Sequence, residues 1–162
     1  MCLALSIGTA GRASASEEAA VLAATESRRV QEMVDAMRLE LDVTHQVGVE
    51  LVAVNPLKAS VEPDKSNAGT YKLSIEQSFL EQLTPVELKA VIAHELGHVW
   101  IYTHHPYLQT EQLANQIALK VVSRESLDSL YGKVWPDAEA KGSLPRFPEE
   151  RAPEPVGTDP QN

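Results

Sequence analysis

The sequence has a single cysteine, no excess of positive charge and no long apolar run, and each of these shortages excludes a class of protein. One thiol, Cys2, cannot form an internal disulfide or a multi-cysteine zinc site. Lysine and arginine number 14 against 23 aspartates and glutamates, so the basic surface that a nucleic-acid partner requires is missing. No uncharged apolar run reaches the roughly 18 residues of a membrane span, so we expect no integral membrane segment.

The composition that remains is that of one folded domain, which we place at residues 16–135. The 162 residues are 43% hydrophobic and 23% charged, which excludes disorder throughout the chain. In residues 1–15, an apolar start and the triplet Ala13-Ser14-Ala15 fit either a signal peptide or a disordered N-terminus. The first interpretation predicts a periplasmic or secreted protein and the second a cytoplasmic one. Residues 136–162 are rich in proline and glutamate, and we expect a disordered tail.

The spacing of apolar residues predicts an α+β fold that is mainly helical. A first helix is expected from Ser16, whereas alternation of apolar and polar residues predicts short strands at 47–54 and 71–75. Two strands do not make a stable sheet alone, so they must pack on helices or gain a third strand from the loop-like segment 57–68. Further helices are expected at 75–83, from residue 84 to 102 or 103, at 109–122 and at 126–134.

The chemistry lies in the segment HELGH at residues 94–98, within the helix that Thr84 and Glu87 start with a capping box. Four residues turn an α-helix by about 400°, so His94 and His98 share a face about 6 Å apart along the axis. Both imidazoles can therefore bind one tetrahedral Zn²⁺. Glu95 lies roughly 100° around the helix, beside the metal, where it can accept a proton from a metal-activated water.

A catalytic zinc needs a third protein ligand and one open position, and three later residues are candidates. His104 has the metzincin spacing, but that pattern has glycine where this chain has Ile101, and it needs a downstream methionine turn. His105 fits no such spacing. Glu111 would open the next helix, with Asn115 one turn further on the same face, where its amide can fix the tautomer of a histidine ligand. The pattern favours Glu111.

The sequence resembles the gluzincin metallopeptidases, whose pattern is H-E-x-x-H on one helix and a glutamate ligand on the next, often as E-x-x-A-[DN]. Residues 94–98 and 111–115 read HELGH and EQLAN. Residues 83–93, which lead into the HELGH segment, are similar to the HtpX-like branch of gluzincins, which includes the minigluzincins. Asn67-Ala68-Gly69 is also similar to a segment of that branch, but less specifically. HtpX itself carries membrane helices, and its branch usually has aspartate where Asn115 stands. Asparagine suits the ImmA/IrrE-type gluzincins, which act on regulatory proteins and are the second assignment.

The resemblance implies a zinc-dependent endopeptidase that hydrolyses peptide bonds in protein or peptide substrates. One Zn²⁺ would be held by His94, His98 and Glu111, with Glu95 as the general base. Asn115 would hydrogen-bond to a histidine ligand without binding the metal itself. A small sheet would lie over the active-site helix, and its edge strand would pair with an extended substrate. The candidate edge residues are Tyr71, Leu73 and Ile75.

Gluzincins often add a tyrosine or histidine that donates a hydrogen bond to the oxyanion. Four residues close to the motif are equal candidates for this role: Tyr102, His104, His105 and Tyr107. The alternative function is a latent or inactive zinc-binding regulatory or interaction module on the same fold. In the latent form, the long first helix or the proline-rich tail would cover the cleft.

Overall fold

The computed structural model describes residues 10–134, with side chains from residue 17 onward, and its architecture confirms the mainly helical α+β fold. In chain order the elements are α1 (Ala10–Glu40), β1 (Gln46–Val52), β2 (Ala59–Pro63), β3 (Thr70–Glu76), α2 (Gln77–Leu80), α3 (Pro85–His104), α4 (Glu111–Ala118) and α5 (Arg124–Val134). Helix α1 begins six residues before the predicted start at Ser16. The predicted tail at 136–162 and the first nine residues of the predicted N-terminal segment lie outside the described residues.

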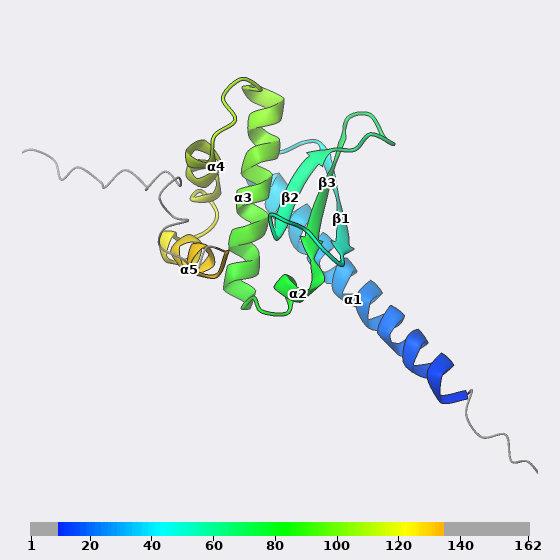
Figure 1. Ribbon diagram of the computed structural model, residues 1–162. Coiled ribbons are helices and arrows are strands. Elements are labelled where there is room, and N and C mark those ends of the chain that lie inside the picture. Colours follow the sequence, from blue (N-terminus) through cyan, green and yellow to red (C-terminus); the bar gives the residue numbers. More distant parts are fainter. Residues whose placement is uncertain (1–9, 135–162) are drawn as a thin grey trace, which may run out of the picture.

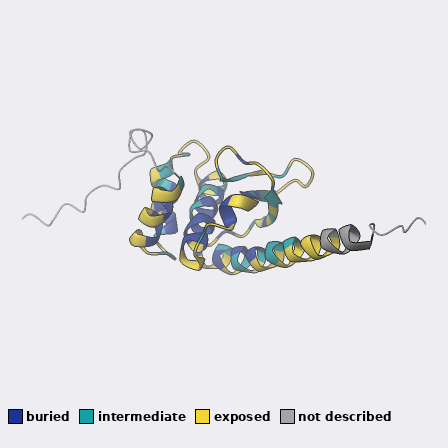
Figure 2. Cartoon of the chain, turned by 60° about the horizontal axis from the view of Figure 1, so that its bottom comes forward, coloured by how far each residue is buried: buried dark blue, intermediate teal, exposed yellow. Residues whose placement is uncertain are grey.

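Helix α3 runs through the middle of the domain, with the sheet on one side and α4 and α5 on the other (Figure 1). Helix α1 packs against both the sheet and α3. Val30, Val34 and Met37 of α1 are buried, whereas Leu39 is 65% exposed. The turns before Val30 project away from the domain and are largely exposed (Figure 2). The core between α1, the sheet and α3 contains fully buried Val34, Leu73 and Ile92. Helix α3 is therefore held by packing on both sides.

The sheet has three strands in the order β1-β3-β2, with β3 parallel to β1 and antiparallel to β2. Of the two alternatives left open by the sequence, a third strand is present: β2 lies within the loop-like segment 57–68. The prediction that Tyr71, Leu73 and Ile75 form the edge strand is wrong, because β3 is central and pairs on both sides. Their alternation reflects burial of Leu73 and Ile75 in the core. The strand that packs against α3 is β2. Its sequence, ASVEP, ends in a charged residue and a proline, so it lacks the apolar alternation that predicts a strand.

Local signals in the sequence set the ends of α3 and α4. The Thr84 hydroxyl accepts a hydrogen bond from the backbone N–H of Glu87, the Glu87 carboxylate accepts one from the N–H of Thr84, and Pro85 occupies the first turn. Thr110 caps α4 by accepting from the N–H of Leu113. Helix α4 is shorter than the predicted 109–122, because it starts only at this cap and ends at Ala118.

Glu87 also fastens α5 to the start of α3. Its carboxylate accepts hydrogen bonds from the Ser129 hydroxyl at 2.8 Å and from the Lys133 ammonium at 2.6 Å, and only 4% of the residue is exposed. Burial opposes ionisation, but the hydrogen bonds from Lys133, Thr84 and Ser129 outweigh it and lower the pKa of Glu87 to about 2. The charged form of Glu87 therefore stabilises the packing of α5 on α3.

We expect the domain to lose stability as the pH falls from about 4.5 towards 2. The ordinary pKa of Glu87 is 4.5, so the folded state holds its proton less tightly than the unfolded chain does. The stabilisation is complete above pH 4.5 and is lost as the pH falls to the folded value. Hydrogen bonds from Ser78, Asn55 and Lys58 lower the pKa of Glu76 to about 2, so Glu76 also stabilises the fold less as the pH falls.

Urea unfolding of the wild type and of Glu87→Gln at pH 7, 5 and 3 measures this dependence. The variant should be less stable at pH 7 by about 1.5–3 kcal/mol, the usual contribution of hydrogen bonds to a charged group, and should depend less on pH. Glu32→Gln, on the exposed face of α1, is the matched control. Equal pH dependence of the wild type and Glu87→Gln would contradict the assignment.

Candidate metal centre

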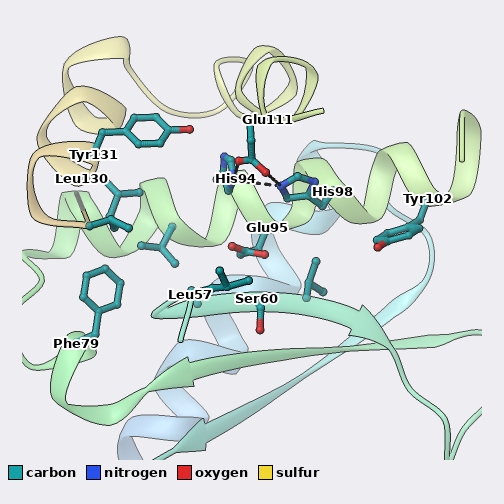
Figure 3. A pocket seen from close by; sticks show the side chains of 14 residues that line it. Leu57, Ser60, Phe79, His94, Glu95, His98, Tyr102, Glu111, Leu130 and Tyr131 are labelled. Carbon is teal, nitrogen blue, oxygen red and sulfur yellow. Dashed lines mark hydrogen bonds and ion pairs between the residues drawn. The ribbon is translucent and has the colours of Figure 1, made fainter. Parts of the chain in front are cut away.

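His94 and His98 of α3 and Glu111 of α4 point toward one another (Figure 3). The two Nε2 atoms lie 3.2 Å apart. One carboxylate oxygen of Glu111 lies 3.1 Å from Nε2 of His94, and the other lies 3.4 Å from Nε2 of His98. In the part of the chain that the structure describes, this is the one group of at least three His, Cys, Asp or Glu residues arranged to hold a metal ion.

A close approach of two helices places Glu111 over the histidines. A Cβ atom on Gly97 would lie only 2.5 Å from the carbonyl oxygen of Ala114, so a larger residue would push α4 away from α3. The cap at Thr110 then sets Glu111 as the first residue of α4. The glycine inside the HELGH segment is therefore what allows the next helix to place Glu111 beside the two histidines.

Two amide side chains fix the orientation of the imidazole rings. Nδ1 of His94 lies 2.8 Å from the amide oxygen of Asn115. This is the hydrogen bond from a histidine ring to the Asn115 amide that we expected from the sequence. Nδ1 of His98 lies 3.2 Å from the amide oxygen of Gln109. An amide oxygen only accepts, so each Nδ1 carries a proton and donates it. Both Nε2 atoms are thereby left with lone pairs that face Glu111.

The charges at the site favour a bound cation. Before a metal binds, a proton on Nε2 of an imidazole can be donated to Glu111, and such hydrogen bonds from His94 and His98 hold the pKa of Glu111 well below its usual range. Burial opposes the charged form of His98, but the hydrogen bonds to Glu111 and Gln109 and the charges of Glu95 and Glu111 together outweigh it and raise the pKa of His98. Three lone-pair donors thus converge on one point, and a proton or a metal ion must lie between them to offset their repulsion.

Glu95 lies beside this group and not within it. Its side chain extends from α3 toward β2 (Figure 3), and 8% of the residue is exposed. Burial raises its pKa, although the nearby His94 and His98 and a hydrogen bond with the backbone of Val61 act in the opposite direction. A carboxyl group held away from the ligands, with a raised pKa, suits proton transfer better than metal binding.

Comparison with known proteins agrees with this geometry. Residues 24–131 match the sequence pattern of peptidase family M48. The chain belongs to peptidase family M48. This is a family of zinc metallopeptidases, so the match confirms the predicted resemblance at the family level, while the choice of branch stays a prediction. No curated protein and no solved structure matches the chain.

The three residues of the metal-binding group lie in a cleft between α3, β2 and α5. Its lining includes His94, Glu95, His98 and Glu111, together with Ala59, Ser60 and Val61 of β2. Of the four predicted oxyanion donors, all of which the structure describes, Tyr102 alone lines this cleft. His104 stacks on Trp100, and both His105 and Tyr107 are exposed. Neither rival third ligand, His104 or His105, belongs to the metal-binding group.

The sequence did not predict two residues that contact this group or its neighbours, Tyr131 and Gln109. The Tyr131 hydroxyl lies 2.8 Å from the amide oxygen of Asn115, and its ring lies 6.3 Å from that of His94, centroid to centroid. Burial raises the pKa of Tyr131 to about 12. The apolar stripe of α5 could have shown that this helix packs inward, but no spacing rule would have brought Tyr131 to a ligand on α3.

The part of the chain that the structure describes contains no helix that is both long enough and apolar enough to cross a membrane.

Proposed function

We propose that this M48 chain is a zinc-dependent endopeptidase that hydrolyses peptide bonds in protein substrates. The observation that carries the proposal is the convergence of His94, His98 and Glu111, with Glu95 beside them at the floor of the cleft. Two imidazoles and one carboxylate are a ligand set that leaves a catalytic zinc one position for water or substrate. Membership of a peptidase family supports the same conclusion.

The spacing of the three donors fits zinc. Tetrahedral ligands with bonds of about 2.0–2.1 Å lie about 3.3 Å from one another. The corresponding distances here are 3.2 Å between the two imidazole nitrogens, 3.1 Å from His94 to one carboxylate oxygen of Glu111 and 3.4 Å from His98 to the other oxygen. With one ligand atom taken from each residue, the three atoms lie within 4.8 Å of one another. The site can therefore accept the ion with little movement of α3 or α4. When bound, zinc supplies a lowered pKa for water and polarises the scissile carbonyl group.

Glu95 carries the proton in the proposed reaction. Its carboxylate accepts a proton from the attacking water and passes it to the amine nitrogen as the peptide bond breaks. The raised pKa of Glu95 brings its proton affinity closer to what this transfer requires. Asn115 and Gln109 keep the imidazoles in the ligating tautomer throughout.

The residue that we assign to the oxyanion is Tyr131, in preference to Tyr102. Its hydroxyl is turned toward the metal ligands (Figure 3), and a pKa of about 12 keeps it protonated at neutral pH. A protonated hydroxyl in a partly buried site can donate a hydrogen bond to the negative oxygen that develops during attack. The contact with Asn115 holds the ring in place before the substrate arrives.

The free edge of β2 replaces the incorrectly predicted edge strand as the docking site for the peptide backbone. Residues 59–61 line the cleft, and the described strands leave the outer side of β2 without a strand partner. An extended substrate can add to this edge by backbone hydrogen bonds and so bring its scissile bond over Glu95. The existing contact between Val61 and Glu95 lies on this path.

That contact also favours the alternative function, a latent or inactive zinc-binding regulatory or interaction module. A peptide must replace the hydrogen bond between Val61 and the general base before it can reach the metal. A latent or inactive chain should bind zinc and digest nothing. Comparing the full chain with one that ends at Val134 separates inhibition by the C-terminal segment from an inactive site.

We expect the purified chain to bind one zinc ion and to digest casein. Treatment with ortho-phenanthroline should remove the metal and abolish digestion, and added zinc should restore both. The non-chelating meta isomer is the matched control, and inductively coupled plasma mass spectrometry gives the zinc content. Digestion that continues after the metal has been removed would contradict the proposal.

A further inference from the structure

The wall of the cleft that β2 forms begins with a tight turn at Lys58. The N–H of Ala59 donates at 2.8 Å to the carbonyl oxygen of Leu57, two residues earlier, and Lys58 between them has a φ of 66°. This is the γ-turn of positive φ, which is rare and strained in proteins. Leu57 and Ala59 both line the cleft, so the strain lies in its wall. Such strain persists only where surrounding contacts hold it, and it is concentrated at functional sites.

A buried carboxylate holds this turn from behind. Glu76, at the end of β3, is 7% exposed, and one of its oxygens lies 2.9 Å from the Lys58 ammonium. The backbone N–H of Glu76 donates to the carbonyl oxygen of Lys58, also at 2.9 Å. Lys58 is thus attached to Glu76 through both its side chain and its backbone. Because hydrogen bonds from Ser78, the Asn55 backbone and Lys58 lower the pKa of Glu76 to about 2, its charge is present at neutral pH.

Asn55 joins the same turn to the sheet. Its backbone N–H donates to the other oxygen of Glu76 at 3.0 Å, and its amide oxygen accepts from the N–H of Leu57 at 3.0 Å. Its amide nitrogen donates to the hydroxyl of Ser60 on β2 and to the carbonyl oxygen of Ser74 on β3. Only 7% of Asn55 is exposed, so little water competes for these bonds. The start of β2 is therefore held in one position.

The turn also decides which backbone groups of β2 face the metal site. In an antiparallel pair, residues that exchange hydrogen bonds with the partner strand alternate with residues whose N–H and C=O groups point outward. The bond between Lys58 and Glu76 starts this alternation. Ala59 and Val61 therefore point outward, as the hydrogen bond between the Val61 backbone and Glu95 indicates. Since the turn uses the N–H of Ala59, the edge along the cleft offers a substrate two carbonyl oxygens and one N–H.

We propose that Lys58 and Glu76 are positioning residues for substrate binding, which hold the strained turn so that the outward groups of β2 are in place to pair with an extended peptide. The inference rests on the proposed peptidase function and names the residues that set its docking edge. Without the ion pair the turn can relax to a negative φ, which moves Ala59 and the start of the edge. Neither residue lines the cleft or belongs to the metal-binding group, so zinc binding should not change.

Steady-state kinetics of zinc-loaded Lys58→Met on an extended peptide test this role. Methionine has a similar length and no charge, so KM should rise about tenfold, roughly the loss of one hydrogen bond at the edge, while kcat should change by less than about twofold. Lys58→Arg keeps the charge and should recover most of the wild-type KM. Lys72→Met is the matched control, because it removes another lysine–glutamate pair of the sheet, with Glu50, and neither of those residues lines the cleft.

The split between KM and kcat separates positioning from a loss of stability alone. A variant that only unfolds more readily has fewer active molecules, which lowers the apparent kcat and leaves KM unchanged. Glu76→Gln is an independent test, because a carboxamide has one acceptor oxygen for donors that now share two, and it should raise KM in the same way. Should it not fold, Lys58→Met still decides, since the Lys58 side chain is 45% exposed.

The outcomes keep this inference apart from the proposed function. An unchanged KM in folded Lys58→Met, or an equal rise in Lys72→Met, would overturn the positioning role and leave the peptidase assignment intact. Absence of any cleavage by the wild type would overturn the peptidase assignment. In that case, fluorescence anisotropy of a labelled extended peptide on zinc-loaded Glu95→Gln, with and without Lys58→Met, decides the positioning role. Binding weakened about tenfold by Lys58→Met supports it, and equal affinities or no binding reject it.

Discussion

Replacing Glu95 with glutamine is expected to lower kcat by at least 100-fold and to leave the metal content unchanged. The carboxamide has the size of the carboxylate and can still accept the hydrogen bond from the Val61 backbone. It cannot accept a proton, and a positioned general base typically contributes 10²- to 10⁴-fold. Because Glu95 is outside the group formed by His94, His98 and Glu111, its charge is not needed to hold the ion.

The measurement pairs zinc stoichiometry with single-peptide kinetics on the same preparation. Glu62→Gln is the matched control, because Glu62 is an exposed glutamate on β2, next in sequence to the Val61 that contacts Glu95. It should behave as the wild type in both assays. Wild-type turnover by a zinc-loaded Glu95→Gln would remove the general-base role, whereas loss of zinc would mean that Glu95 contributes to the metal site.

Local rules predicted the part of the site that lies on one helix. The capping box of Thr84 and Glu87 sets the start of α3, and helical periodicity then puts His94 and His98 on one face. The structure brings these side chains together as the spacing indicated. Glu111 was a choice among three candidates, and the close contact at Gly97 explains physically why the next helix can reach the two histidines.

Longer-range features could not be derived in this way. The order of the strands depends on which of them the helices cover, so an alternating pattern in β3 indicated a strand without giving its place in the sheet. Gln109 holds His98 only because the chain folds back after His105. Tyr131 reaches Asn115 through the packing of α5, which the buried Glu87 carboxylate holds against the first turn of α3.

The second large effect is expected from Glu111→Ala, which should weaken zinc binding by more than 100-fold. Loss of a residue that only hydrogen-bonds to a metal ligand usually weakens metal binding by about 10- to 100-fold. The substitution removes the one carboxylate among the three donors and leaves the two imidazoles without their anionic partner. Helix α4 should persist, because Thr110 caps it and Ala114, Ile117 and Ala118 remain buried. Competition with a fluorescent chelator at neutral pH measures the affinity.

Two further variants give this prediction its scale. Asn115→Ala removes only the acceptor for Nδ1 of His94, so its loss of affinity should fall within 10- to 100-fold and below that of Glu111→Ala. Glu125→Ala, an exposed glutamate in the first turn of α5, should bind zinc as the wild type does. An unchanged affinity in Glu111→Ala would return the third position to His104 or His105. That outcome would require α3 to end earlier than it does here, since His104 now stacks on Trp100 on an exposed part of the helix.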